Sequence, residues 1–347
     1  GQANVVNNIE IFHNFMIKVA FFDAKSYDEV SFNKTNADYG FDIHYYQEHL
    51  NLKTVPLAKG ADVVCIFVNA ECNAAVIDEL IKNGVKLIAL RCAGFNNVDL
   101  KAAKGRIKVV RVPAYSPHAV AEYAVSLMLA LNRKIFRAVN RTREGNFALK
   151  GLMGFDMYGK TAGIVGMGRI AKELIKILHG FGMKVLAYDL YPDMEFAKQY
   201  DVQMVSLDEL YAESDIISLH CPLTPETTFL INAQSIAKMK PGVMIINTGR
   251  GKLINTEELI EGLRTKRVGS AGLDVYEEEK NYFYEDRSDK IIDDDVLARL
   301  LMMPNVVLTS HQAFFTVEAM HNIALTTLES IKEFGEGKPL TNEVVEQ

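Results

Sequence analysis

The sequence has few cysteines and no long apolar run, and both features limit the classes of protein to which the chain can belong. Its 347 residues include four cysteines, with no Cys-x-x-Cys pair and no spacing typical of metal ligands. We therefore expect free thiols, a reducing cytoplasmic location and no metal site. No run of about 18 apolar residues is present, so we also expect no membrane span. The cysteines are Cys65, Cys72, Cys92 and Cys221.

An excess of basic residues is also missing. The chain carries 38 Lys and Arg against 44 Asp and Glu, which gives a net charge of −6. Because binding to phosphate backbones needs clustered Lys and Arg, we expect no nucleic-acid partner. Hydrophobic residues make up 49% and charged residues 24% of the chain, the balance of an ordinary globular enzyme. A chain of this length exceeds one compact core, so two domains are expected.

The sequence shows no internal repeat, no low-complexity tract and no signal-peptide pattern at its start. The apolar stretch Ile9–Phe15 is too short for a signal sequence and lacks a basic start. We interpret residues 1–15, which precede Met16, as an upstream extension that takes no part in the fold. A single long polar insertion is expected at Glu277–Asp295.

Short apolar runs alternate with longer amphipathic stretches, a pattern that predicts parallel sheets flanked by helices. In the first part of the chain a helix is expected over Ala74–Lys82. The expected strands there are Ile17–Phe22, Ile43–Tyr46, Asp62–Val68, Lys86–Leu90 and Lys108–Val112. This part therefore forms one small α/β unit that ends near Pro113.

A second α/β series follows a long helix predicted over His118–Arg133, which Ser116 and Pro117 introduce as N-cap and first helical residue. Six strands are expected in the second series, the number of a full dinucleotide-binding sheet. They are Thr161–Val165, Lys184–Tyr188, Asp215–Leu219, Gly242–Ile246, Ala271–Val275 and Val306–Thr309, with helices such as Ile170–His179 and Thr256–Arg264 between them. A last helix over Thr316–Phe334 has no strand after it, so we expect it to return to the first unit. The domains predicted are residues 116–315 and a discontinuous one of residues 1–115 and 316–347.

A glycine-rich turn between a predicted strand and a predicted helix indicates a dinucleotide site. Gly166, Gly168 and Ala171 fit the pattern Gly-x-Gly-x-x-(Gly/Ala). The first glycine permits a tight turn, the second lets the backbone approach a pyrophosphate, and the small third residue lets helix and strand pack closely. The pattern alone is common, and its place between strand and helix makes it informative.

The acidic residue after the next strand indicates which dinucleotide binds. Asp189 lies 21 residues beyond Gly168, close to the spacing of the acid that binds the ribose hydroxyls. A carboxylate there repels a 2′-phosphate, so NAD is favoured over NADP. The alternative is that Asp189 only caps the turn before Pro192.

Three further segments place chemically capable side chains at the carboxyl ends of strands, where ligands bind in open α/β sheets. Arg250 follows one strand within Asn247–Lys252 and can hold a carboxylate with two parallel hydrogen bonds. Three glutamates follow the next strand at 277–279, and spacing alone does not choose among them. His311 follows the last strand. Each has an ordinary alternative as a surface arginine, a solvated acidic face or a structural histidine, but together they supply an anion clamp, a carboxylate and an imidazole.

These motifs, in this order, resemble those of the D-isomer-specific 2-hydroxyacid dehydrogenases, and are most similar to the fermentative D-lactate dehydrogenases among them. The resemblance covers the chain from Met16 to its end. Besides the Gly166 fingerprint, it rests on Arg91–Asp99, Val112–Pro117, Ala121–Glu122, His220–Pro225, Asn247–Gly251, Gly272–Glu277 and Ser310–Phe314. Two departures are Ala171 for the commoner third glycine and Phe67 where some relatives have tyrosine.

The resemblance implies an α/β fold of two Rossmann-like domains, with residues 116–315 binding NAD, residues 1–115 and 316–347 forming the substrate domain, and the active site in the cleft between them. It implies that Arg250 binds the substrate carboxylate and that His311 exchanges a proton with the carbonyl oxygen. Family spacing selects Glu279 as the partner that favours protonated His311. The implied reaction is the reduction of pyruvate to D-lactate, in a homodimer or homotetramer that associates around the helix after Pro117.

Other positions are assigned by the same resemblance. Those expected to contact NAD, besides the two fingerprint glycines and Asp189, are Arg169, Ile170, Cys221, Pro222, Thr227, Thr248, Gly249 and Asp274. Ordinary turn or core duty is the alternative for Cys221 and Thr227. Those expected around the substrate are Phe67, Ala93, Gly94, Tyr115 and Phe314, besides Arg250.

Two rival functions stay open at this point. The first is a dehydrogenase for larger 2-oxo acids such as phenylpyruvate or 2-oxoisocaproate. The bulky walls expected from Phe67 and Phe314 argue against it. The second is a non-enzymatic NAD sensor that acts as a transcriptional partner. The chain has no disordered tail, basic patch or extra docking domain to favour that reading.

Overall fold

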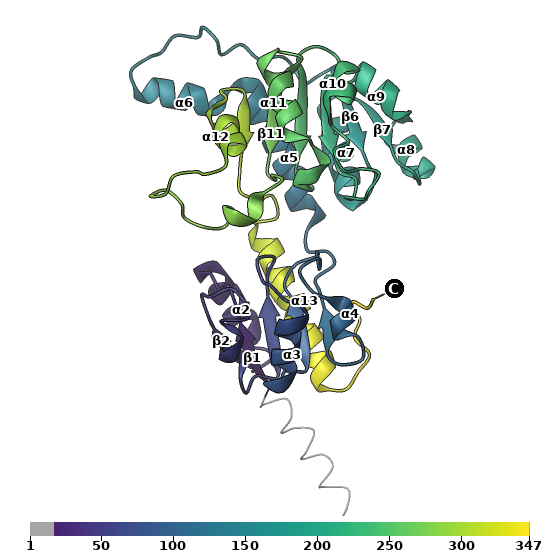
Figure 1. Cartoon of the computed structure of the whole chain (residues 1–347). Coiled ribbons are helices and arrows are strands. Elements are labelled where there is room, and N and C mark those ends of the chain that lie inside the picture. Colours follow the sequence, from purple (N-terminus) through teal and green to yellow (C-terminus); the bar gives the residue numbers. More distant parts are fainter. Residues whose placement is uncertain (1–16, 347) are drawn as a thin grey trace, which may run out of the picture. The chain divides into compact units, whose positions relative to one another are not determined.

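The computed structural model describes residues 17–346, so the interpretation of residues 1–15 lies outside the described part. The chain divides into two units, shown with their elements in Figure 1. The first runs through Ser116 and resumes at Phe315, and the second is Pro117–Phe314. Each crossover lies one residue from the predicted boundary. Both units are α/β, as predicted, and each is built on a parallel sheet.

The first unit contains a five-stranded parallel sheet in the order β2-β1-β3-β4-β5. This is the doubly wound order 2-1-3-4-5, in which the strand order reverses between β1 and β3 while all strands stay parallel. Two of the three inner strands, β3 and β4, are fully buried, because helices cover both faces of a parallel sheet and these strands are continuous apolar runs. The strands are β1 (Lys18–Phe21), β2 (Asp42–Tyr45), β3 (Val63–Ile66), β4 (Leu87–Leu90) and β5 (Lys108–Val110).

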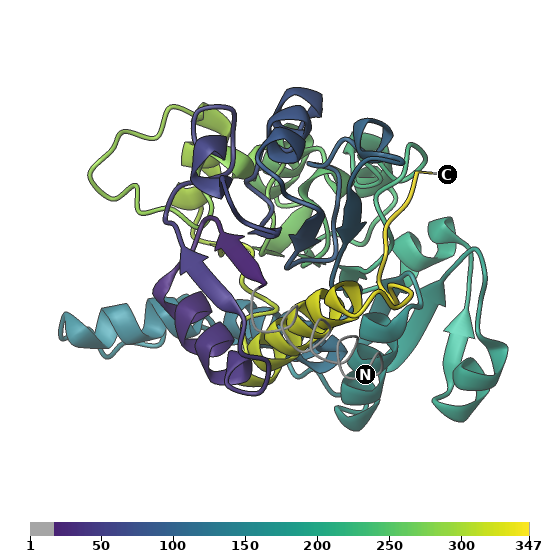
Figure 2. The ribbon, with the colours of Figure 1, turned by 90° about the horizontal axis from the view of Figure 1, so that it is seen from below.

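Helices from both ends of the chain pack on this sheet. The C-terminal helix α13 (Val317–Gly335) lies against α2 (Ser26–Asn36) and β4, and Figure 2 shows the two helices side by side in yellow and purple. Thr316 caps α13 by accepting a hydrogen bond from the amide of Ala319. The other helices of the unit are η1 (Val55–Ala58), α3 (Ala74–Lys82) and α4 (Leu100–Ala103).

The second unit contains a seven-stranded parallel sheet in the order β12-β11-β10-β9-β6-β7-β8. The prediction of six strands was wrong by one, because β8 adds a three-residue edge strand beside β7. The strand order reverses between β6 and β9, which creates the crevice where open α/β sheets bind ligands. The strands are β6 (Thr161–Val165), β7 (Lys184–Tyr188), β8 (Val202–Met204), β9 (Ile216–Leu219), β10 (Val243–Asn247), β11 (Val268–Leu273) and β12 (Val306–Leu308).

Helices cover both faces of this sheet and form two apolar cores. On one face α5 (Pro117–Arg133) and α7 (Arg169–Gly180) pack together over β6, β7 and β10. On the other face lie α9 (Leu207–Glu213), α11 (Thr256–Arg264) and α12 (Asp295–Met302). The remaining helices are α6 (Ile135–Arg143), α8 (Met194–Gln199), α10 (Ala233–Ala237), η2 (Gly251–Leu253) and η3 (Glu279–Asn281).

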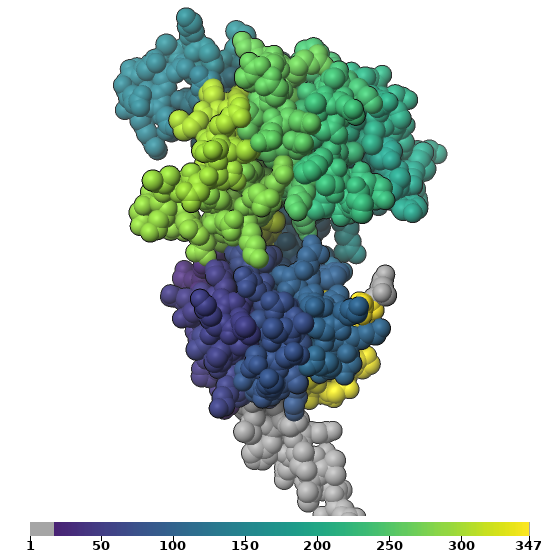
Figure 3. All heavy atoms as spheres, viewed as in Figure 1, coloured from purple at the N-terminus to yellow at the C-terminus, as the bar shows by residue number. Residues whose placement is uncertain are grey.

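One part of the second unit stands apart from these layers. The helix α6 and the loop that follows it project from the unit as a separate lobe, seen in teal in Figure 3. No side chain of α6 is buried. Within residues 17–346, no helix is both long enough and apolar enough to cross a membrane.

Candidate active site

The glycine-rich turn lies at the point where the strand order reverses. Gly166 directly follows β6 and has a φ of +95°. A Cβ at this position would lie 2.7 Å from the carbonyl group of His220 and 2.8 Å from the amide of Cys221, after β9. Both the positive φ and the close approach of the neighbouring backbone therefore require glycine here.

The second glycine leaves room for a ligand. Gly168 is the N-cap of α7 and makes no side-chain cap, and a Cβ built on it would meet no atom within 4 Å. The first backbone amides of the 12-residue helix α7 include those of Arg169 and Ile170. The N-terminal end of this helix is thus open to an anion. Ala171 is completely buried in the core that joins α7 to β6, where a larger side chain would separate them. The turn therefore fits the pyrophosphate of a dinucleotide.

Asp189 follows β7 directly and connects two turns. Its Oδ2 accepts a hydrogen bond of 2.7 Å from the amide of Met167, and its Oδ1 accepts one of 2.7 Å from the amide of Tyr191. The carboxylate therefore caps the turn before Pro192, as the alternative interpretation proposed, and is also fastened to the glycine-rich turn. Its predicted contact with ribose stays a prediction.

The segment after β9 lies against Gly166, and its polar groups are largely engaged within it. The hydroxyl of Thr227 donates to the carbonyl of Pro222 at 2.7 Å, which closes a turn at Pro222–Thr227. Burial raises the pKa of Cys221 to about 11, so this side chain is a neutral thiol at physiological pH. Thr227 thus has a structural duty in this turn, whether or not it also contacts a cofactor.

The turn that carries Arg250 is built by the last residue of β10. Asn247 is buried, and its Nδ2 donates to the carbonyl of Arg250 at 3.0 Å while its Oδ1 accepts from the amide of Gly249 at 3.0 Å. Arg250 itself is exposed. Beside it, the hydroxyl of Thr248 is buried without a hydrogen-bond partner among the described residues. A buried, unpartnered hydroxyl at the carboxyl end of a strand fits a hydrogen bond to a bound cofactor.

The three glutamates after β11 have different surroundings. Glu277 caps α11, because its Oε1 accepts 2.7 Å hydrogen bonds from both the amide and the hydroxyl of Thr256. Glu278 is exposed. Glu279 lies 2.8 Å from Nδ1 of His311 through its Oε2, and its Oε1 accepts from the amide of Tyr276 at 3.3 Å. The structure thus pairs His311 with the glutamate that family spacing selected.

His311 follows β12 and is held in a strained backbone conformation. Its φ is +53°, a region that residues with a side chain seldom occupy. Its amide donates to the carbonyl of Asp274 at 2.7 Å. The side chains of His311 and Glu279 are 27% and 23% exposed, so the pair is sheltered but open to a small molecule. The carboxylate on Nδ1 fixes the orientation of the imidazole and leaves Nε2 for a ligand.

Asp274, predicted to contact NAD, anchors the loop of His311. It is completely buried, and its carboxylate accepts hydrogen bonds of 2.6 Å from the Thr309 hydroxyl, 2.8 Å from the Gln312 amide and 2.8 Å from the Ala313 amide. Burial raises the pKa of Asp274, although these hydrogen bonds act in the opposite direction. Both carboxylate oxygens are thus engaged by the segment that carries His311.

The residues predicted to surround the substrate belong mainly to the first unit. Phe67 follows β3, and Ala93 and Gly94 lie a few residues after β4, at the same edge of that sheet. Tyr115 lies further along the chain, and its carbonyl accepts a 2.6 Å hydrogen bond from Asn322 of α13. Phe314 is the last residue of the second unit. Their contacts with substrate stay predictions.

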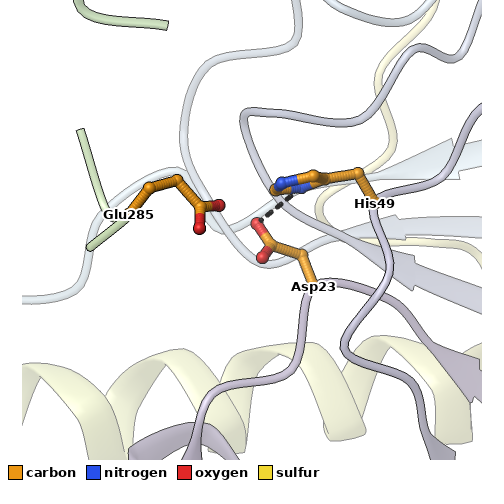
Figure 4. Close-up of side chains that lie close together, drawn as sticks. All are labelled: Asp23, His49 and Glu285. Atoms are coloured by element: carbon orange, nitrogen blue, oxygen red, sulfur yellow. Dashed lines mark ion pairs between the residues drawn. The ribbon is translucent and has the colours of Figure 1, made fainter. Parts of the chain in front are cut away.

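A buried ionic cluster at the same edge of the first sheet was not predicted. Asp23 follows β1 and is 3% exposed, and its Oδ2 lies 3.3 Å from Nδ1 of His49 (Figure 4). The Asp23 carbonyl accepts from buried Arg91, whose guanidinium carbon lies 5.1 Å from the ring centre of Phe67. Burial acts to raise the pKa of Asp23, but His49, Arg91 and Lys25 outweigh burial and keep the pKa below its usual value. Because these residues are far apart in sequence, spacing gave no signal for the cluster.

Comparisons with known proteins show the family to which this chain belongs. The sequence-family model of the NAD-binding domain of D-isomer specific 2-hydroxyacid dehydrogenases matches residues 125–313, which is more than half of the chain. The chain belongs to this family and is an NAD-dependent oxidoreductase. The predictions of family and cofactor are therefore confirmed.

Relatives cover nearly the whole chain. A D-lactate dehydrogenase of Escherichia coli is 50% identical to this chain, over 95% of this chain and 100% of its own length. The apo-structure of D-lactate dehydrogenase from Escherichia coli has a TM-score of 0.87 and covers 95% of this chain and 100% of its own. A pyruvate reductase of Chlamydomonas reinhardtii is 43% identical, with a TM-score of 0.91 over 95% and 99% of the two chains. A D-lactate dehydrogenase of Lactobacillus jensenii, solved with NAD⁺, is 32% identical, with a TM-score of 0.81 over 95% and 100%.

Proposed function

We propose that this chain is a D-lactate dehydrogenase that reduces pyruvate with NADH. The observation that carries the proposal is the pairing of His311 with Glu279 in the unit that binds NAD, with Arg250 at the end of the strand next to β11. An anion clamp, an imidazole and a carboxylate at the ends of β10, β12 and β11 are what reduction of a 2-oxo acid requires. The D-lactate dehydrogenase and the pyruvate reductase among its relatives support lactate and pyruvate as the pair of substrates.

The proposed roles follow from the chemistry of each side chain. Arg250 holds the substrate carboxylate by two parallel hydrogen bonds, which fixes the carbonyl in orientation. When bound, NADH would supply a hydride to the carbonyl carbon. His311 donates the proton on Nε2 to the carbonyl oxygen, so that a hydroxyl forms as the C=O π bond breaks. Glu279 stabilises the protonated imidazole through Nδ1, and in the oxidative direction His311 accepts the proton back.

The residues proposed to bind NAD contact three parts of the cofactor. Gly166, Gly168 and the first turn of α7 would receive the pyrophosphate, and Asp189 the ribose hydroxyls. The buried hydroxyl of Thr248 supports a polar contact near the nicotinamide end.

We also propose a cytoplasmic location, which the absence of a disulfide among the four cysteines supports.

The substrate range is tested by comparing 2-oxo acids of increasing size. We propose that Phe67 and Phe314 leave room for a methyl group, so kcat/KM with NADH should be highest for pyruvate and fall for 2-oxoisocaproate and phenylpyruvate. A higher kcat/KM for phenylpyruvate would assign the chain to the larger 2-oxo acids instead. Phe314→Ala should improve the larger substrates relative to pyruvate. Its matched control is Phe315→Ala, which removes a ring that packs on Tyr27 at 4.8 Å.

We further propose that the chain self-associates through the second unit. The lobe formed by α6 and its following loop exposes several large apolar side chains, and an open cavity of about 640 Å³ runs beside α6, between the end of α5 and the segment Leu300–Thr309. Exposed apolar clusters of this kind mark protein interfaces. The apolar side chains are Ile135, Phe136, Val139, Phe147, Leu149 and Met153.

A further inference from the structure

The insertion between β11 and α12 supplies an aromatic residue that contacts the proposed catalytic histidine. The ring of Tyr284 stacks on the imidazole of His311 with centroids 6.2 Å apart and planes 25° from parallel. The Tyr284 hydroxyl donates a 2.9 Å hydrogen bond to the His311 carbonyl oxygen. One side chain thus contacts both the ring and the backbone of the residue proposed to transfer the proton.

The insertion is built to hold Tyr284 in this place. Its far end is fastened at Asp294, whose Oδ2 accepts a 2.6 Å hydrogen bond from the Tyr276 hydroxyl and whose amide donates to the Tyr282 hydroxyl at 3.1 Å. Phe283 is buried in the core of the second unit. Tyr284 itself has a φ of +70°, a strained conformation that surrounding contacts must maintain. The segment is therefore a folded support, although its sequence is mostly charged.

The contacts of His311 show why such a support matters. A residue with a side chain costs free energy at φ +53°, and it stays there only when its neighbours hold it. Asp274 holds the amide, Glu279 holds Nδ1 and Tyr284 holds the carbonyl oxygen. The described residues thus contact the amide, the carbonyl oxygen and Nδ1 of His311, and Nε2 is the polar atom left for a ligand. Proton transfer depends steeply on position, so a loose carbonyl would displace Nε2 from its acceptor.

We propose that Tyr284 is a positioning residue: its hydroxyl and its ring fix the strained backbone and the imidazole plane of His311, so that Nε2 meets the substrate. This inference rests on the proposed role of His311. It predicts a graded effect, because Tyr284→Phe removes the hydrogen bond and keeps the ring, whereas Tyr284→Leu removes both.

The test combines kinetics with a measurement that needs no substrate. In single turnovers of enzyme-bound NADH with saturating pyruvate, Tyr284→Phe should be about three- to tenfold slower than wild type, and Tyr284→Leu slower still. The solvent isotope effect on this step should rise in both variants while NADH affinity stays unchanged. Amide hydrogen exchange of the segment Thr309–Ala313, measured on the free protein, should accelerate in the same order.

The matched control is Tyr282→Phe, which removes a hydroxyl from the same insertion without touching His311. This variant should unfold at a lower temperature but keep the wild-type turnover rate, isotope effect and exchange at Thr309–Ala313. Equal losses in Tyr282→Phe and Tyr284→Phe, or wild-type exchange and rates in Tyr284→Leu, would overturn the proposal. If the wild type does not reduce pyruvate, the proposed function fails, but the exchange measurement still tests whether Tyr284 holds His311.

Discussion

At the scale of single residues, the site depends on side chains that hold one another in place. His311 has its amide, carbonyl oxygen and Nδ1 engaged by Asp274, Tyr284 and Glu279. Arg250 is placed by the buried amide of Asn247. The sequence could indicate Arg250 and His311, because each follows a strand, and the resemblance selected Glu279. It could not indicate Tyr284 or the loop-anchoring duty of Asp274, since these contacts join residues 27 or more positions apart.

Replacing the histidine should separate chemistry from cofactor binding. His311→Gln keeps a hydrogen-bonding side chain of similar size but cannot donate a proton as an imidazolium does. We expect kcat for pyruvate reduction to fall about 10²–10⁴-fold while the Kd for NADH, measured by fluorescence titration, stays near the wild-type value.

Arg250→Lys serves as the comparison for this variant. An ammonium group keeps the positive charge but cannot make two parallel hydrogen bonds, so the main effect should be a higher KM for pyruvate. Near-normal kinetics in both variants would contradict the assignment of the site.

At the scale of elements, the long periodic segments were predictable and the short ones were not. Ala74–Lys82, Thr161–Val165, Lys184–Tyr188 and Thr256–Arg264 form as predicted. The edge strand β8 was missed because three residues carry too little periodicity to be recognised. The stretch Glu277–Asp295 was expected to be a long polar insertion, and contacts of Tyr276, Phe283 and Asp294 give it fixed structure.

The glycine-rich turn gives a prediction at this scale, because its two glycines are required for different reasons. Gly168→Ala should fold normally, since the added Cβ meets no protein atom, but it should weaken NADH binding by occupying the space of the pyrophosphate. Gly166→Ala should lower the free energy of unfolding by about 1–3 kcal/mol or more, because its φ is +95° and the Cβ meets the His220 carbonyl. Urea unfolding and NADH titration of both variants check this. Equal stabilities would contradict it.

The segment after β9 should make stability sensitive to acid. Burial lowers the pKa of His220 to about 4, so its imidazole stays neutral in the folded state where the unfolded chain, with a pKa near 6.5, binds a proton. The unfolded state thus gains protons first, and stability should fall as the pH drops from about 6.5 toward 4.

A comparison of histidine variants isolates this effect. Because the residue is partly exposed to solvent, we expect His220→Asn to reduce the loss of unfolding free energy between pH 7 and pH 5 by about 1 kcal/mol. Urea unfolding at both pH values measures this difference. The control is His321→Asn, an exposed histidine of α13. An unchanged pH dependence in His220→Asn would show that this histidine is not responsible.

At the scale of the whole molecule, two features stand out: the order of the strands in the two parallel sheets, and the exposed apolar lobe formed by α6 and its following loop. The sequence predicted two parallel α/β units, because helices must separate successive parallel strands and leave a recognisable alternation. It could not show that the apolar residues of α6 stay exposed, because an amphipathic pattern indicates an apolar face but not what packs on that face. Only the structure shows that the apolar side chains of α6 and its following loop are exposed.

The exposed lobe gives the prediction for assembly. Phe136 and Leu149 are 59% and 81% exposed, an arrangement that favours association between copies of the chain. Sedimentation velocity should show at least a dimer for the wild type and a shift toward monomer for Phe136→Asp combined with Leu149→Asp. The same substitution at Leu190, which is 76% exposed on another part of the unit, is the control. A monomeric wild type would contradict this prediction.

We propose that this chain reduces pyruvate to D-lactate. The most direct test is to follow NADH absorbance after adding pyruvate and then to determine the handedness of the lactate formed. We expect rapid loss of NADH and D-lactate as the product. Formation of L-lactate, or no turnover by a protein that still binds NADH, would contradict it.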